Sequence, residues 1–128
     1  MILQYGNSID RAARIDAFNK LMRGSQLDTV KAGSLFGLAT TMMDEVATAE
    51  DKAQARKLFA ELEKRFGALA SPMGKTYAVL AQSFLFELDH LQLGMQVPDF
   101  EATDETGAKF KLSDYAGKVV VVDFWGFW

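Results

Sequence analysis

The chain has 128 residues, of which 49% are apolar and 24% charged, and this composition is typical of a folded globular protein. Its 14 basic and 17 acidic side chains give a formal net charge of -3, so nothing in it resembles the basic surface of a nucleic-acid-binding protein. No apolar run is long enough to span a membrane, and the absence of cysteine excludes disulfides and thiolate metal sites.

The first two helices are predicted from apolar residues at helical spacing. Asn7 or Ser8 is expected to cap the first helix, and Gly24 is expected to end it. The second is expected to begin near Asp28 and to continue to Val46. Both helices have one apolar face, so we expect them to pack against neighbours.

Two more helices are predicted before residue 94. The third is expected to start after Thr48, a good capping residue, and to end at Gly67. The fourth is expected to open at Ser71 and Pro72, with proline at the first helical position, and to run through Leu91.

The similar lengths of these helices suggest antiparallel hairpins stacked as a short solenoid of the tetratricopeptide kind, or a small bundle. No internal repeat is strong enough to define a true solenoid. Gly33 and Gly37 lower helix propensity in the second helix but permit a neighbouring helix to approach closely. A bundle or solenoid cap is favoured over a peptide-binding groove.

After residue 94 the apolar pattern changes from helical spacing to alternation. Residues 100–112 read as a β-hairpin with its turn at 104–107, where Gly107 takes the position that requires positive φ. Ser113 is then expected to cap a single helical turn that ends at Gly117.

The residues Val119 to Phe124 are apolar except for Asp123, which is typical of a central strand covered on both faces. A bare strand of β-branched residues is prone to association. We therefore expect it to be covered by a partner chain, by exchange between two copies in a homo-oligomer, or by the helical region.

The C-terminal segment carries glycines, a proline, and aromatic and charged residues at several independent spacings: Gly94, Pro98, Asp99, Phe100, Gly107, Leu112, Ser113, Asp114, Tyr115, Gly117, Lys118, Phe124, Trp125 and Trp128. With these residues the segment resembles the opening of thioredoxin-like proteins of the TlpA/ResA (redoxin, AhpC/TSA-related) group. The resemblance implies a helical domain over residues 1–92 and a truncated redoxin domain over 93–128. The fold class is then α+β, with four helices followed by a hairpin and the first central strand of an incomplete thioredoxin-like fold.

The resemblance also implies a chemistry. In the family a C-x-x-C pair follows the position of Trp128, and Asp123 matches a carboxylate that exchanges a proton with the second cysteine. Trp125 and Trp128 match aromatic residues that offer a surface to the substrate. Protein disulfides and a thiol reductant are the implied partners, thiol–disulfide exchange or peroxide-linked antioxidant activity is the implied reaction, and no cofactor is expected. Relatives are usually exported, whereas the residues after Met1 lack the layout of a secretory signal, so the compartment stays open.

Without cysteine, the chain as written is expected to be redox-inactive. Three hypotheses explain why a redoxin sequence stops at Trp128. In the first, the sequence was simply cut at this point, and in the second, a stop codon or frameshift has decayed the gene. In the third, the next codon is UGA, which encodes selenocysteine in the native host. The alternative function is a non-catalytic helical interaction module that oligomerises through its β-segment. His90, the only histidine, is a weak candidate ligand because no second histidine or cysteine accompanies it, and no metal site is expected.

Overall fold

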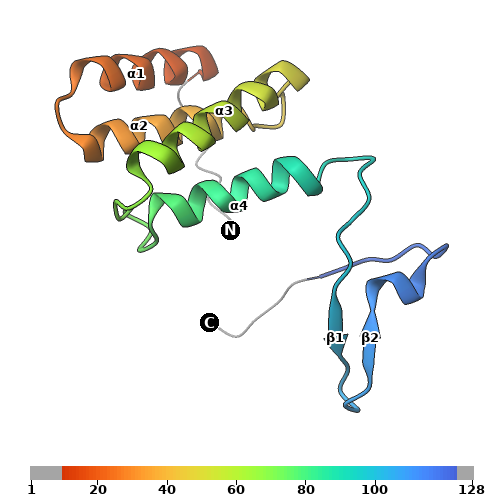
Figure 1. The fold of residues 1–128 in the computed structure, drawn as a ribbon. Helices are drawn as coiled ribbons and strands as arrows, with labels where there is room; N and C mark the ends of the chain where they lie inside the picture. Colours follow the sequence, from red (N-terminus) through yellow and green to blue (C-terminus); the bar gives the residue numbers. More distant parts are fainter. Residues whose placement is uncertain (1–9, 124–128) are drawn as a thin grey trace, which may run out of the picture. The chain divides into compact units, whose positions relative to one another are not determined.

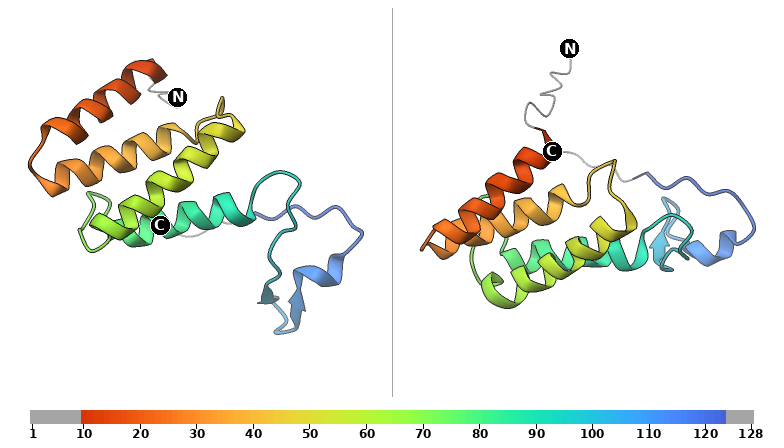
Figure 2. Two further views of the ribbon diagram at one scale, coloured as in Figure 1. Left: turned by 45° about the horizontal axis from the view of Figure 1, so that its top comes forward. Right: turned by 90° about the horizontal axis from the view of Figure 1, so that it is seen from above.

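The computed structural model describes residues 10–123, which form two compact units that divide between Leu93 and Gly94. The first unit contains four helices: α1 (Arg11–Gly24), α2 (Asp28–Thr41), α3 (Ala49–Phe66) and α4 (Tyr77–His90). Each helix packs against the next one along the chain and runs antiparallel to it (Figures 1 and 2). The predicted set of four helices is therefore confirmed.

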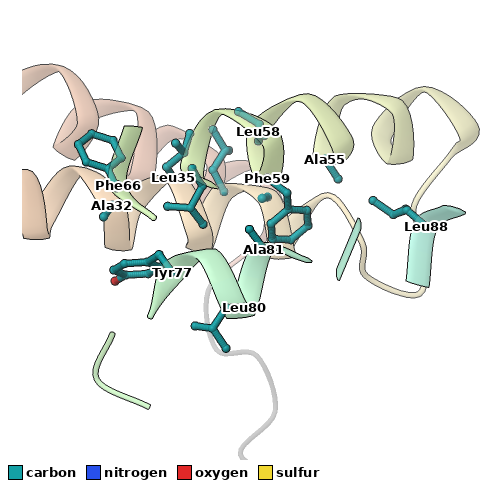
Figure 3. Close-up of a cluster of buried hydrophobic side chains, with 13 residues drawn as sticks. Ala32, Leu35, Ala55, Leu58, Phe59, Phe66, Tyr77, Leu80, Ala81 and Leu88 are labelled. Atoms are coloured by element: carbon teal, nitrogen blue, oxygen red, sulfur yellow. The ribbon is translucent and has the colours of Figure 1, made fainter. Parts of the chain in front are cut away.

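The core of this unit lies between α2, α3 and α4 (Figure 3). Phe59 and Leu62 of α3 and Leu35 of α2 are its largest fully buried side chains. The ring of Phe59 stacks on Phe84 of α4 with centroids 4.8 Å apart, and the edge of Phe36 meets it from α2 at 6.3 Å. Full burial of such a side chain contributes about 1.5–3 kcal/mol, so this cluster stabilises the packing of the three helices.

The first helix begins later than predicted. Its cap is Asp10, whose carboxylate accepts a hydrogen bond from the backbone N–H of Ala12 at 3.1 Å. The expected caps Asn7 and Ser8 lie outside the described residues, and the prediction that one of them caps α1 is wrong. Asp10 directly precedes the first helical residue, Arg11. Its carboxylate is as suitable an acceptor for the unpaired N–H groups of the first turn as the side chain of asparagine or serine.

The second helix ends five residues before the predicted limit, at Thr41 rather than Val46. Both Thr40 and Thr41 donate their hydroxyls to backbone carbonyls one turn earlier, and the Thr41 bond to Gly37 is 2.8 Å long. Val46 is 71% exposed, so burial does not extend the helix to it.

The third helix begins as predicted. Thr48 accepts a hydrogen bond from the N–H of Asp51, while the Asp51 carboxylate accepts one from the N–H of Thr48. This reciprocal capping box satisfies two donors that the helix itself leaves unpaired.

The predicted start of the fourth helix at Ser71 and Pro72 is wrong. The N–H of Ser71 donates to the carbonyl of Lys75 at 2.8 Å, and Gly74 has φ of 75°, so residues 71–75 form a tight turn instead. Thr76 is the actual cap, with its hydroxyl accepting from Val79 N–H at 3.4 Å.

The N-terminus of α1 is tied to the rest of the helical unit by charged side chains. Arg11 contacts Asp44, in the connection after α2, at 3.1 Å and Asp51, in the first turn of α3, at 2.9 Å. Hydrogen bonds from Thr48 and Arg11 lower the pKa of Asp51 to about 2, and the bond to Asp51 in turn raises the pKa of Arg11. No α1 side chain is fully buried, so these contacts supplement the limited apolar packing of that helix.

The second unit is built on a β-hairpin. Strand β1 (Glu101–Thr103) pairs antiparallel with β2 (Lys109–Lys111), and a single 3-10 turn, η1 (Leu112–Tyr115), follows. Gly107 has φ of 87°, which confirms the predicted positive-φ position in the connecting turn. The Asp104 carboxylate accepts the N–H groups of Thr106 and Ala108 at 2.8 and 3.0 Å, and therefore fixes this turn.

The strand predicted from Val119 to Phe124 is absent from the described part, residues 119–123, and Phe124 lies outside it. A strand is defined by hydrogen bonds to a neighbour, and the described residues offer no strand beside this run. A local apolar pattern alone was therefore not sufficient to form it.

Candidate functional site

The hairpin of the second unit has one polar and one apolar face. Ala102 and Phe110 lie opposite each other in the register and are partly buried, whereas Glu101, Lys109 and Lys111 are exposed. Lys109 also pairs with Glu101 at 2.9 Å across the polar face. Because side chains alternate along a strand, the apolar face is free to line a site while the polar face meets solvent.

A hydrogen-bonded clamp holds the two ends of the hairpin together. Asp99, just before β1, accepts the N–H of Ser113 at 2.9 Å and its hydroxyl at 2.8 Å. Both bonds favour the charged carboxylate and therefore lower the pKa of Asp99, and the bond from the Ser113 backbone has the largest effect. Next to the clamp, Leu112 N–H donates to the carbonyl of Phe100 at 3.1 Å.

The clamp corrects the role predicted for Ser113. Ser113 lies inside η1 rather than at its cap, and its hydroxyl is donated to Asp99. The cap of η1 is instead Lys111, the residue directly before it, and the N–H of Lys111 donates to the Asp114 carboxylate at 2.9 Å. The Asp99 to Ser113 contact was missed in the sequence because it joins residues 14 positions apart through tertiary structure.

An open pocket of about 370 Å³ lies on the apolar side of the hairpin. Phe110 and Tyr115 meet edge to face at a centroid distance of 6.1 Å, and the Lys118 ammonium lies 5.7 Å from the Tyr115 ring. The lining is apolar apart from the Tyr115 hydroxyl and the carboxylate of Asp123. The lining residues are Phe100, Phe110, Leu112, Tyr115, Val120, Val121, Val122 and Asp123. Such a surface suits apolar side chains that carry or adjoin a positive charge.

The predicted site residues fall in this unit. Asp123 lines the pocket and is exposed, so its carboxylate is reachable from solvent. Trp125 and Trp128 lie outside the described residues, and their predicted role as a substrate surface stays a prediction. The structure therefore places one of the three residues beside an apolar pocket.

The remaining candidates from the sequence belong to the helical unit. His90 is exposed at the end of α4, with its ring 4.7 Å from that of Phe86. Between residues 10 and 123, no group of three histidine, cysteine or acidic side chains is placed to hold a metal ion. No helix of the described part is both long and apolar enough to cross a membrane.

Comparison with known proteins identifies the second unit. Residues 93–128 match the model of the AhpC/TSA family. The thiol-disulfide oxidoreductase ResA of Bacillus anthracis is 41% identical over 49 residues, which are 38% of this chain and 28% of the relative. ResA of Geobacillus kaustophilus is 44% identical over 46 residues, or 36% of this chain and 26% of the relative.

Residues 93–128 therefore carry a thioredoxin-like redoxin segment of the AhpC/TSA family. The matched part of the chain spans little more than a quarter of the length of these curated relatives. No solved structure matches the chain.

Proposed function

We propose that this chain is the N-terminal portion of a thioredoxin-like thiol-disulfide oxidoreductase, with a helical region ahead of the opening of the redoxin domain. The observation that carries the proposal is the match of residues 93–128 to the AhpC/TSA family and to ResA. The clamped hairpin and its apolar pocket support it, since they form a defined surface beside Asp123. The substrates of the whole protein would be protein disulfides, reduced at the expense of a thiol reductant.

In thiol-disulfide exchange, a thiolate attacks one sulfur of the substrate disulfide and forms a mixed disulfide. A second thiol loses its proton, attacks the mixed disulfide, and releases the reduced substrate while the enzyme is oxidised. We assign Asp123 to accept the proton of that second thiol and Trp125 and Trp128 to form the surface that meets the substrate. A selenol in place of the first thiol suits the same scheme, because it is ionised at neutral pH.

The 128 residues contain no cysteine and should not catalyse this exchange. Insulin reduction by dithiothreitol in the presence of the chain should proceed at the rate of buffer alone. A rate above that of buffer alone would show that the chain catalyses the reduction without cysteine, and this would contradict the proposed mechanism.

A chimera tests the proposal in a catalytic setting. Residues 93–128 would replace the matching segment of Bacillus anthracis ResA, and the chimera should retain disulfide reductase activity. Asp123→Asn in the chimera should slow the reaction by about tenfold or more, because a general base typically contributes at least that much. Glu105→Gln, at the exposed hairpin turn, is the matched control and should leave the rate unchanged. A folded but inactive chimera would contradict the assignment.

A second function is supported by a separate observation, the exposed apolar run at residues 119–122. Val119 and Val121 are 99% and 89% exposed. We propose that this run and the hairpin mediate self-association, which makes the chain an interaction module that forms a homo-oligomer. Sedimentation of the 128-residue chain over a range of concentrations tests this, and a monomer at every concentration would contradict it.

A further inference from the structure

The helical unit contains an open cleft of its own, formed by α1 and the connection that follows α2. It has a volume of about 490 Å³, which leaves room for several water molecules or a small organic group. Its lining combines charged and apolar side chains: Arg11, Arg14, Met43, Asp44, Glu45 and Val46.

Most of the charged atoms around this cleft are paired with one another. Arg11 contacts Asp44 Oδ2 at 3.1 Å and Asp51 at 2.9 Å, and Arg14 Nη2 lies 3.6 Å from the same Asp44 oxygen. Two buried atoms, Arg14 Nε and Asp44 Oδ1, have no hydrogen-bond partner among the described residues. Because buried polar groups are nearly always paired, an unpaired donor beside an unpaired acceptor points to a ligand or to water.

The two unpaired atoms belong to neighbouring groups. Nε and Nη2 of Arg14 are bonded to one carbon, and so are Oδ1 and Oδ2 of Asp44. Since Nη2 and Oδ2 are 3.6 Å apart, a single small ligand can reach both the unpaired N–H and the unpaired oxygen. Such a ligand must accept a hydrogen bond from Arg14 and donate one to Asp44.

The charges of the lining favour a neutral ligand. Two arginines and two carboxylates, those of Asp44 and Glu45, balance each other. A carboxylate ligand would have no N–H for Asp44, and an ammonium or guanidinium ligand would have no acceptor for Arg14. A primary carboxamide offers a carbonyl oxygen and an N–H on the same edge, whereas a trans secondary amide has them on opposite sides.

We propose that the cleft binds a primary carboxamide of the kind that glutamine and asparagine carry. Its carbonyl accepts from Arg14 Nε–H, and its NH₂ group donates to Asp44 Oδ1. Both hydrogen bonds involve a charged partner and are therefore among the stronger ones. The methylene groups of the ligand meet Met43 and Val46, and Val46 is 71% exposed. The site gives the helical unit a binding role that does not depend on the redoxin assignment.

An NMR titration of the 128-residue chain tests the proposal, with N-acetylglutamine methylamide as the probe. The Arg14 Nε–H resonance should shift and saturate with a dissociation constant of about 1–10 mM, as expected for a small ligand. The γ-methyl ester of N-acetylglutamate methylamide is the matched control compound, since it keeps the carbonyl and the neutral charge but lacks the NH₂ group. It should bind about tenfold more weakly, because Asp44 Oδ1 is then left unpaired.

One conservative substitution tests the donor. Arg14→Lys keeps the positive charge but removes the Nε–H, and it should weaken binding of the probe by about tenfold. Binding is then followed through the backbone amides of residues 43–46. Arg23→Lys is the matched control, because Arg23 is exposed in the last turn of the same helix and should not affect binding. Circular dichroism at the helix band should be the same for both variants.

Free glutamine distinguishes the two sources of the amide. Tighter binding of the probe than of free glutamine would assign the site to a peptide, and the reverse would assign it to a free amino acid; both results uphold amide recognition. An Arg14 Nε–H resonance that does not respond to either compound would indicate that water satisfies the two atoms, and it would overturn the proposal. Equal affinity for the amide and the ester would overturn the assigned bond to Asp44. The redoxin assignment is tested separately, because the chimera contains none of these residues.

Discussion

Gly37 permits the contact between α1 and α2, and its replacement by alanine tests how α1 is held. A Cβ atom at Gly37 would lie 2.4 Å from the Phe18 ring of α1, which is too close for any real contact. Gly33, one turn earlier on the same helix, offers a matched control. A Cβ atom there would lie 3.4 Å from the Tyr77 hydroxyl, which is ordinary contact.

The expected magnitudes follow from two opposing effects. Glycine to alanine inside a helix stabilises by about 1 kcal/mol, because alanine loses less backbone entropy on folding. Gly33→Ala should therefore raise the free energy of unfolding by up to about 1 kcal/mol. Gly37→Ala has the same gain but forces Phe18 out of its place, and overpacking costs about 1–3 kcal/mol. We expect a net change between zero and a loss of about 2 kcal/mol.

Urea denaturation followed by circular dichroism at the helix band measures both variants, and a double-mutant cycle with Phe18→Ala assigns the cause. If the Phe18 ring is the obstacle, Gly37→Ala should become stabilising by about 1 kcal/mol in the Phe18→Ala background. A shift of that size moves the melting temperature of a domain this small by about 4–8 °C. An equal loss in both backgrounds would refute the contact as the reason for glycine at this position.

Two further predictions concern carboxylates with lowered pKa. Asp99→Asn should speed amide hydrogen exchange at Ser113 and across the hairpin, because the uncharged amide replaces one of the two acceptor oxygens; unchanged exchange would show that the clamp does not hold the hairpin. Asp51 has a folded pKa of about 2, below its ordinary 3.8, so its contribution to stability is complete above about pH 4 and is lost as the pH falls toward 2. The difference in melting temperature between the original chain and Asp51→Asn should therefore shrink below about pH 4, and a difference that stays constant down to about pH 2.5 would contradict the linkage.

Local signals predicted the helices well and their ends unevenly. Thr48 and Asp51 lie three residues apart, so the capping box was readable from the sequence. Ser71 and Pro72 have an equally good helix-start pattern, yet the Ser71 N–H is used in a turn closed by Lys75. When a local sequence pattern is compatible with two structures, contacts with residues outside the pattern determine which of the two forms.

The candidate site was predictable in part for the same reason. Alternation and Gly107 were sufficient to predict the hairpin. The spacing of family residues indicated Asp123 as a candidate, and its role stays a prediction. The contact between Asp99 and Ser113 depends on how the hairpin closes, so spacing alone did not indicate it. The run at Val119 had the composition of a strand, but strand formation also requires a neighbour.

The nucleotide sequence of the native gene across and beyond codon 128 tests the redoxin assignment most directly. Our account predicts an open frame in which a cysteine codon, or a UGA read as selenocysteine, begins a motif that ends in cysteine three positions later. A stop codon with no thioredoxin frame downstream would contradict the account and would leave the self-associating module as the function of this chain.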